Sequence, residues 1–519
     1  MAIRKLQVPM LSCLLALAGV ALSLQPPMAQ GAQEQASTPT IWGPQEPPFR
    51  PTHPIAIVGG TLIDATGAAP KIEQTVVIEG NRITAIGRNE DVRIPRGAQV
   101  IDAAGMTIMP GIINSNQHLQ LNPLYPAPVA NLPLEVLKAR WEDVYARMPD
   151  RAYVYLMQGI TSMRHTSGPW HRILPVKQRI DSGEAAGPRI FLGGALLMSD
   201  EYFEHYMKTQ HTPKEAREWM AKEFAYHVVK DVDADTDRFL GPEFNFWKLL
   251  MSDEDFNGKN DFTDEELRFI INKAHAAGKH VDVHTTGTNI GLRRMLAFDV
   301  DTLEHPFYGT ELIEEDIIKG YVKKGVTVDT LLVQMISPAL RRADPHRFNE
   351  TLYISSMRPD EYRILLRYRD KMLYNQRHPD APEVPIYQSP GVEAPPPSDG
   401  RTYNEIQARR ATSVANMRRF IREGAKFSLG TDTPAYLNFQ QEDPNASEFR
   451  FMIEQGMSPM DAIIAATRNG AQVLGMADQL GTIEKGKIAD VIVVAGNPLV
   501  DPNAMKRVFA VIKDGVRYK

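Results

Sequence analysis

Four apolar runs, far apart in the sequence, end in side chains that can bind a metal ion. The first ends in Asn116 and His118, and the other three end in His284, His305 and Asp432. Zinc-like ions bind imidazole nitrogens and carboxylate oxygens, and a catalytic metal site keeps one position open for water. One such run would carry little weight, because a lone histidine after a strand is usually a core residue. Four in order predict a metal-dependent catalytic site.

These side chains can meet only if the runs that carry them are brought together. The carboxyl ends of parallel strands in a barrel converge on one mouth, so ligands distant in sequence can surround one ion there. The middle of the chain fits this arrangement, because strand-like runs alternate with helical patterns. In the helix before His284, Thr263 and Glu266 match a capping box. An apolar stripe follows in that helix, at Leu267, Ile270, Ile271 and Ala274.

Other local patterns predict further elements. Ser458 followed by Pro459 predicts a helix that starts there and runs to Leu474. Short β-type runs separated by glycine turns lie near both ends of the chain and favour a small antiparallel structure. They comprise residues 55–58, 75–78, 82–86, 491–494 and 508–512.

Taken in order, these motifs resemble the amidohydrolase superfamily, and within it the imidazolonepropionase-like and prolidase-like branch. The resemblance covers most of residues 55–519 and is specific for the superfamily rather than for a substrate. Besides the four ligand runs, it rests on residues 100–105 leading into 109–113, and on residues 159–164, 187–190, 275–278 and 481–490.

The resemblance implies an α/β fold, a (β/α)8 TIM-type barrel with a small flanking β-sandwich built from both chain ends. The sandwich would comprise residues 55–106 and 481–519, and the metal-dependent barrel residues 107–480. The chain departs from the usual pattern at residues 338–409, a long polar and proline-rich insertion between strands seven and eight. An insertion on the face from which the βα loops emerge would be a lid over the site or an oligomer contact, and the alternative is a solvated surface excursion.

The resemblance also implies a carboxylated lysine at the end of the fourth barrel strand, and Lys248 is the best match. An unmodified lysine has a pKa of ~10.4 and would repel a divalent cation, whereas a carbamate would bind one. The alternative is an ordinary lysine in an aromatic-rich segment. His284 and His305 end consecutive strands, as the family pattern requires of metal ligands. Asp432 can touch the metal and act as general base and then as acid, although a helix N-cap Asp would have the same pattern.

The first strand departs from the family pattern. The usual His-x-His is Asn116-Gln117-His118 here, and Asn114 replaces the usual Asp. An amide oxygen is a weaker ligand than imidazole for zinc-like ions. We therefore favour one divalent ion, zinc, over two, held by the ligands of strands four to six. His118 and Asp432 would complete a second site or contact the substrate, and two ions would require Asn116 or a water as a ligand.

Three further residues are candidate substrate contacts. Arg164 and His165 end strand two in place of the family's Arg-Asp pair, and Tyr308 lies just beyond His305. The Arg164 guanidinium could bind a substrate carboxylate through its fork of donors. Each of the three residues could equally be structural.

Charge balance restricts the partners. The chain has 519 residues and a formal net charge of -5, so no positive excess favours nucleic acid or an anionic membrane. We expect a small-molecule or short-peptide substrate, and a homo-oligomer remains open.

The first residues have the pattern of a targeting segment. Residues 1–31 match a signal peptide, and residues 32–54 match a linker. The apolar run is shorter than the ~20 residues that a membrane span needs, although an uncleaved anchor is the alternative. The only cysteine, Cys13, lies in this segment, so the mature chain would have no disulfide and no thiolate ligand. We expect a periplasmic or secreted protein without stable membrane insertion after signal cleavage.

The sequence thus predicts a metal-dependent hydrolase that uses a metal-bound hydroxide to cleave an amide-type C–N bond, with Asp432 moving the proton. An acyl amino acid, a dipeptide or a cyclic amide would fit, and the fold does not choose among them. The alternatives are a lactone or ester hydrolase, a lyase or isomerase on the same barrel, and an inactive binding protein. Asp432 argues against the last, because a binding module has no need for a base beside the ion.

Overall fold

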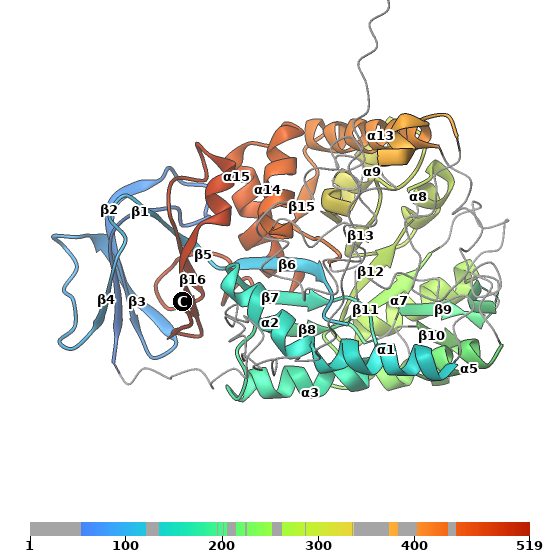
Figure 1. Cartoon of the computed structure of the whole chain (residues 1–519), viewed down its shortest axis with the longest axis horizontal. Coiled ribbons are helices and arrows are strands. Elements are labelled where there is room, and N and C mark those ends of the chain that lie inside the picture. The colour runs from blue at the N-terminus through green and yellow to red at the C-terminus, as the bar shows by residue number, and fades with distance from the viewer. Residues whose placement is uncertain are drawn as a thin grey trace, which may run out of the picture. The chain divides into compact units, whose positions relative to one another are not determined.

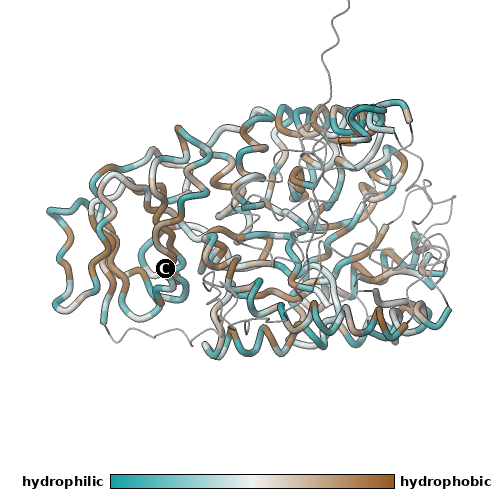
Figure 2. Tube along the Cα trace, viewed as in Figure 1, coloured by the Kyte–Doolittle hydropathy of each residue, from teal (hydrophilic) through white to brown (hydrophobic). Residues whose placement is uncertain are grey.

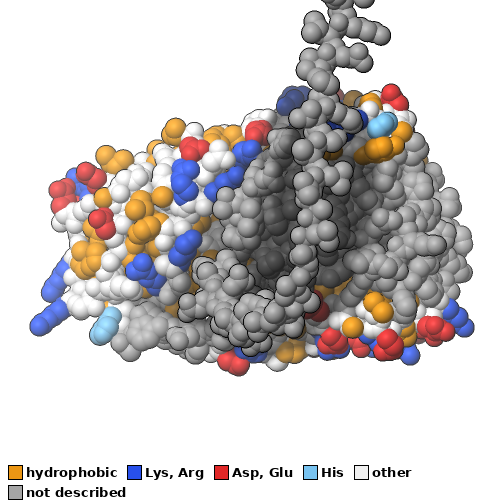
Figure 3. Space-filling view, viewed as in Figure 1, with side chains coloured by type: hydrophobic (Ala, Val, Ile, Leu, Met, Phe, Trp, Pro, Cys, Tyr) orange, Lys and Arg blue, Asp and Glu red, His pale blue; other side chains and the backbone are white. Residues whose placement is uncertain are grey.

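The computed structural model describes residues 53–120, 134–194, 196–200, 202–204, 214–223, 226–251, 262–285, 287–334, 336, 373–381, 402–433 and 443–519. The predicted signal peptide and nearly all of the predicted linker lie outside these ranges. Within them, no helix is long and apolar enough to cross a membrane. In Figure 3, acidic and basic side chains intersperse along the lower edge of the face shown, in keeping with the balanced composition.

Strands from both ends of the chain pair in one eight-stranded sheet (Figure 1). They are β1 (Ile55–Leu62), β2 (Lys71–Glu79), β3 (Arg82–Arg88), β4 (Gln99–Asp102), β5 (Thr107–Pro110), β16 (Val491–Val494), β17 (Val508–Lys513) and β18 (Val516–Arg517). The order is β18-β17-β16-β5-β1-β2-β3, with β4 beside β1. The two ends of the chain join where β16 pairs antiparallel with β5.

The five β-type runs near the chain ends are all strands, as predicted. The sheet is mixed rather than purely antiparallel as had been predicted, because β4 and β5 both pair with β1 in parallel. Its buried face is aliphatic, and Figure 2 shows apolar residues concentrated along these strands. The buried set includes Ile55, Ile57, Val76, Ile78, Ile108, Val491 and Val493.

The ligand-bearing runs belong to two parallel sheets. The first contains β6 (Ile112–Gln117), β7 (Ile160–His165) and β8 (Arg189–Leu192). The second has the order β10-β9-β11-β12-β13-β14-β15 and contains β9 (Leu196–Ser199), β10 (Tyr226–Val229), β11 (Phe246–Leu250), β12 (His280–His284), β13 (Thr302–Glu304), β14 (Thr327–Asp329) and β15 (Lys426–Ser428). The parallel α/β arrangement of the middle of the chain is confirmed.

Backbone hydrogen bonds connect the two parallel sheets at both edges of the smaller one. Beside β6, Ser115 N donates to Leu429 O at 2.8 Å, and His118 N donates to Thr433 O at 2.8 Å. Beside β8, Asn245 N donates to Leu192 O at 2.8 Å. The end of β6 therefore lies next to the segment that follows β15, which carries Asp432.

Helices alternate with the parallel strands. They are α1 (Leu134–Ala146), α2 (Met148–Met157), α3 (Trp170–Asp181), α5 (Lys214–Glu223), α6 (Val232–Asp237), α7 (Asp264–Ala276), α8 (Asn289–Met295), α9 (Glu315–Lys324), α13 (Tyr403–Arg422), α14 (Pro444–Glu454), α15 (Pro459–Ile464) and α16 (Gly470–Val473). Short 3-10 turns comprise η1 (Arg238–Leu240) and η5 (Pro502–Lys506). The capping box of α7 is confirmed, because the Thr263 side chain accepts from Glu266 N and the Glu266 side chain accepts from Thr263 N. All four predicted stripe residues of α7 are buried.

The helix predicted from Ser458 to Leu474 begins as expected but is not one regular helix. After α15, residues Ala465–Asn469 form a π-helical segment, η4, and α16 ends at Val473. A π turn leaves backbone groups free for other partners. Here Ala465 O accepts from Leu429 N at 3.2 Å, and the Asn469 side chain donates to Phe427 O at 2.8 Å. The irregular turn thereby fixes the chain around the end of β15, just before Asp432.

The long insertion predicted at residues 338–409 falls between β14 and β15. Most of it lies outside the described residues, which include only 373–381 and 402–409 of that range. The second of these parts begins α13, whose N-cap Thr402 forms a capping box with Glu405. The interpretations of the insertion as a lid, an oligomer contact or a surface excursion therefore stay predictions.

Candidate metal centre

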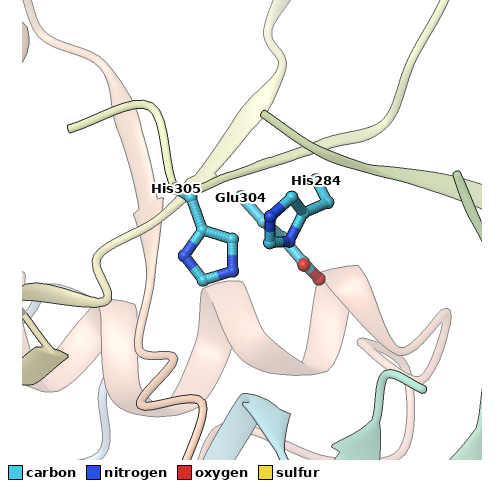
Figure 4. Close-up of side chains that lie close together, drawn as sticks. All are labelled: His284, Glu304 and His305. Atoms are coloured by element: carbon cyan, nitrogen blue, oxygen red, sulfur yellow. The ribbon is translucent and has the colours of Figure 1, made fainter. Parts of the chain in front are cut away.

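His284, Glu304 and His305 form a compact group at the ends of two neighbouring strands. His284 ends β12 and is in register with Glu304, the last residue of β13. The ring centroids of His284 and His305 lie 4.3 Å apart. One ligand atom from each of the three side chains lies within 4.8 Å of the others. Figure 4 shows the two imidazoles side by side with the Glu304 carboxylate below the His284 ring, an arrangement that can surround one cation.

Asp432, which follows β15 of the same sheet, and His118, which follows β6 of the smaller sheet, lie beside this group. His118 Nε2 lies 2.7 Å from Asp432 Oδ1, and His305 Nε2 lies 3.6 Å from Asp432 Oδ2. His118 is oriented from behind, because its Nδ1 donates to Ser167 O at 3.0 Å. Gln334 Nε2 donates to Asp432 Oδ2. The structure thus brings His118, His284, His305 and Asp432 together, as the sequence predicted.

Two of these residues have an uncommon backbone conformation. The φ angles are 58° at His305 and 51° at Asp432, in the left-handed region. A residue with a Cβ pays about 1–2 kcal/mol there. The Asp432 backbone is fixed by a hydrogen bond from its N to Asn116 O at 2.7 Å. Such strain persists where the surroundings over-determine a position, which is typical of functional sites.

Burial sets the charge of the ligand candidates. It lowers the pKa of His305 to about 3 and the pKa of His284 well below the usual value. Both rings are therefore neutral at physiological pH, the form that binds metals. Burial alone would raise the pKa of Asp432, but the His118 hydrogen bond and nearby positive charge hold it below the ordinary value. Two neutral imidazoles and a carboxylate are the donor set that a zinc-like ion prefers.

Lys248 lies in the middle of β11 rather than at its end. It is in register with Asp282, whereas Leu250 is in register with His284. Its Nζ is buried, 2.5 Å from Glu304 Oε2, and donates to Thr166 Oγ1 at 3.3 Å. Lys248 therefore lies one layer of side chains before the strand ends, and its Nζ reaches the group through Glu304.

Asn116 lies at the edge of the site, next to His118. Its Oδ1 accepts from Thr166 Oγ1 at 2.8 Å. Its Nδ2 is buried and has no hydrogen-bond partner among the described residues. The oxygen that would bind a metal is thus already engaged by a hydroxyl.

Two of the three predicted substrate contacts, Arg164 and His165, are buried. Arg164 has no exposed surface, and its guanidinium pairs with Asp282 through contacts of 2.8 and 2.5 Å. Its Nη2 also lies 3.6 Å from Asp329 and 3.9 Å from Glu304, so no donor faces outward to a substrate carboxylate. This position favours the structural alternative.

His165 and Tyr308, the remaining predicted contacts, differ in position. His165 Nε2 accepts from Leu119 N at 3.1 Å, and burial lowers the pKa of His165 well below its usual value, which also favours a structural role. The Tyr308 ring is half-buried and its centroid lies 4.5 Å from that of His305. Tyr308 is the one of the three that is not fully buried, and it lies against a ligand candidate.

Sequence reasoning missed Glu304, Thr166 and Gln334. Strand alternation would place Glu304 and His305 on opposite faces, but the left-handed φ of His305 ends the alternation, so both side chains reach one group. The adjacent Glu-His pair at a strand end was the signal that could have found Glu304. Thr166 directly follows β7, and Gln334 lies beyond β14 in a segment without a motif. Only their contacts in three dimensions mark them.

Comparison with known proteins identifies the family and the fold of this chain. Residues 107–517 match the amidohydrolase family. A stretch of 118 residues is 33% identical to the 5-methylthioadenosine/S-adenosylhomocysteine deaminase of Symbiobacterium thermophilum, over 21% of this chain and 27% of that protein. The match thus spans about a quarter of the length of that curated relative.

Two solved structures share the fold over most of the chain. A Xaa-Pro dipeptidase with bound methionine has a TM-score of 0.64 at 22% identity, covering 90% of this chain and 100% of the other. A molinate hydrolase has a TM-score of 0.66 at 24% identity, covering 90% and 95%. Since the family match extends over most of the chain, this protein belongs to the amidohydrolase family and is a hydrolytic enzyme.

Proposed function

We propose that this enzyme is a metal-dependent hydrolase that cleaves an amide-type C–N bond in a small molecule or short peptide. The observation that carries the proposal is the group of His284, Glu304 and His305 with the Asp432 carboxylate beside it. Neutral imidazoles next to an ionised carboxylate combine metal ligands with a proton acceptor. The left-handed backbone at His305 and Asp432 adds support, because strained conformations concentrate at functional sites.

The residues fit a divalent ion, most simply zinc. Both ring nitrogens of His305 are buried and lack hydrogen-bond partners among the described residues, which a metal ligand would explain. His284 and His305 would hold the ion together with a carboxylate. We propose that carboxylated Lys248 supplies it, as the family resemblance implies, and Glu304 is the alternative donor, because unmodified Lys248 pairs with Glu304 at 2.5 Å. When bound, the ion would polarise the substrate carbonyl and lower the pKa of a coordinated water to ~7.

The chain's own residues move the proton. Asp432 accepts a proton from the attacking water as its oxygen bonds to the carbonyl carbon, and then delivers that proton to the nitrogen as the C–N bond breaks. His118 on Oδ1 and Gln334 on Oδ2 hold the carboxylate in place. Tyr308, beside His305, would contact the acyl part of the substrate.

The proposal includes the frame around the site. The hydrogen bonds between β6 and the segment after β15 support a closed (β/α)8 barrel over residues 107–480. The shared sheet of both chain ends supports a separate β domain of residues 55–106 and 481–519. The signal-like residues 1–31 support export to the periplasm or the exterior.

The test is hydrolysis by the purified mature chain before and after metal removal. The panel pairs each N-acyl amino acid and dipeptide with the ester of the same acyl group, and adds lactones. We expect amide hydrolysis that a chelator abolishes and zinc restores. Full activity in metal-free protein would overturn the metal, and turnover of esters and lactones alone would overturn the amide bond.

A further inference from the structure

We propose that Thr166 sets the number of metal ions in this site, because its hydroxyl occupies the place that a second cation would need. The inference rests on the proposed metal-dependent function and goes beyond it, since it explains the ion count by a residue outside the ligand set. Thr166 directly follows β7 and has no exposed surface.

The Thr166 hydroxyl lies at the meeting point of three predicted ligands. Its Oγ1 is 2.8 Å from Asn116 Oδ1, 3.3 Å from His118 Nε2 and 3.3 Å from Lys248 Nζ. These are the predicted ligands outside the His284, Glu304 and His305 group, Asp432 aside. A second ion would draw on Asn116 Oδ1 and His118 Nε2, and the Thr166 oxygen already lies within 2.8 and 3.3 Å of these two atoms.

The hydrogen bonds of this hydroxyl have a defined direction. Lys248 Nζ donates to Thr166 Oγ1, and Thr166 Oγ1 donates to Asn116 Oδ1. Zinc ligands of nitrogen or oxygen lie at about 2.0–2.2 Å from the ion. For an ion to bind there, Asn116 Oδ1 would have to give up its donor and the buried hydroxyl would have to find another acceptor. The weak amide ligand and the hydroxyl thus act together against a second ion.

The first group differs in this respect. Neither ring nitrogen of His305 has a hydrogen-bond partner among the described residues, so no hydroxyl competes with an ion there. His305 therefore offers ring nitrogens that no described group engages, whereas Asn116 Oδ1 on the other side of the site is engaged by the Thr166 hydroxyl. It follows that Asn116→His supplies a stronger ligand but leaves the Thr166 oxygen in place.

The experiment measures zinc per chain by elemental analysis after zinc loading and dialysis. The proteins are the wild type, Asn116→His, Thr166→Ala, and the double variant Asn116→His/Thr166→Ala. We expect the wild type and both single variants to retain one ion and the double variant to retain two. Asn116→His/Thr166→Ser restores the hydroxyl and is expected to return to one. Asn116→His/Thr161→Ala is the matched control, because Thr161 is a buried threonine near the start of the same strand, and it is also expected to retain one.

The outcomes separate the two proposals. A wild type with no tightly bound ion would overturn the metal-dependent function itself. A wild type with one ion and a folded double variant that also retains one would overturn only the role of Thr166. Two ions in the wild type or in Asn116→His alone would likewise overturn it. Thermal unfolding of each variant identifies those that fold. If the alanine variant does not fold, Asn116→His/Thr166→Val removes the hydroxyl with nearly the same shape, and one ion in that folded variant would overturn the role of Thr166.

Discussion

Both oxygens of the Asp432 carboxylate are held in position by neighbouring side chains. His118 Nε2 contacts Oδ1, Gln334 Nε2 donates to Oδ2, and His305 Nε2 lies 3.6 Å from Oδ2. Gln334 must present its nitrogen to Asp432, because its oxygen would meet another acceptor. Since the carboxylate is ionised and fixed, its remaining capacity is to accept a proton within the site.

We predict that Asp432→Asn lowers kcat by about 10²–10⁴-fold, because the amide keeps the shape but cannot accept a proton. Zinc content is expected to persist through His284 and His305. Steady-state kinetics with the best amide substrate and elemental analysis check both. Asp490→Asn is the control, since Asp490 is a buried carboxylate paired with Arg189 away from the site. Unchanged turnover in Asp432→Asn would exclude Asp432 as the proton carrier.

At the scale of elements, a layer of buried charge lies beneath the ligands and connects six strands. The Arg164 guanidinium of β7 is its centre: Nε donates to Ser115 O at 2.7 Å, and the other nitrogens face three carboxylates. Ser115 Oγ donates to Asp329 at 2.5 Å, and Ser428 Oγ donates to the same oxygen. The layer comprises Ser115 of β6, Arg164 of β7, Asp282 of β12, Glu304 of β13, Asp329 of β14 and Ser428 of β15.

This layer explains why the ligands hold their positions. Asp282 and Glu304 precede His284 and His305 on the same strands, so Arg164 ties together the two strands that carry the histidines. Burial raises the pKa of Asp282, Glu304 and Asp329, and the Arg164 cation opposes that rise in each. Removing one partner of a buried ion pair leaves an uncompensated charge.

We predict that Arg164→Met lowers the free energy of unfolding by about 3–5 kcal/mol and also weakens zinc binding, because the histidine strands lose their common tie. Urea unfolding and competition with a chromogenic chelator measure the two effects. Arg189→Met is the matched control: Arg189 pairs with Asp490 at 2.9 Å and Asp514 at 2.5 Å, and it also donates to Ser162 Oγ of β7, a strand that carries no proposed ligand. A loss of stability without a loss of zinc affinity is expected there. Equal zinc affinity in both variants would show that Arg164 only stabilises the fold.

Local sequence patterns predicted the positions of helices and of candidate ligands, but they did not predict side-chain contacts between distant strands. The capping box and apolar stripe of α7 were readable because each feature depends on residues three or four apart. His284, His305 and Asp432 were readable because each follows an apolar run. Arg164 was not, because its partners lie on strands more than a hundred residues away, so the sequence could not distinguish a substrate contact from a buried ion pair. The same holds for Thr166, whose role depends on three side chains from other strands.

At the scale of the whole molecule, the buried Glu448 side chain connects α14, which follows β15, with the segment that follows β14. Glu448 of α14 accepts from Leu332 N at 2.9 Å and from Val333 N at 2.6 Å, just beyond β14. That segment also carries Gln334, so Glu448 supports the group that holds Asp432. Burial raises the pKa of Glu448 to about 7, although the backbone hydrogen bonds oppose the rise.

This raised pKa makes the stability of the whole fold depend on pH in a defined direction. In the unfolded chain a glutamic acid loses its proton near pH ~4.3, whereas folded Glu448 keeps it until about pH 7. Between these values the folded state binds more protons than the unfolded state, so stability falls as pH rises through this window and is constant above it.

Glu448→Gln removes the titration while it keeps an acceptor for one of the two N–H groups. We predict that the wild type loses about 3 kcal/mol relative to this variant between pH 4 and pH 8, at ~1.4 kcal/mol per pKa unit. Urea unfolding of both proteins across that range measures the difference, with Glu265→Gln as a control because Glu265 is exposed on α7. Parallel stability curves for the wild type and Glu448→Gln would mean that Glu448 ionises in the folded protein as it does in the unfolded chain.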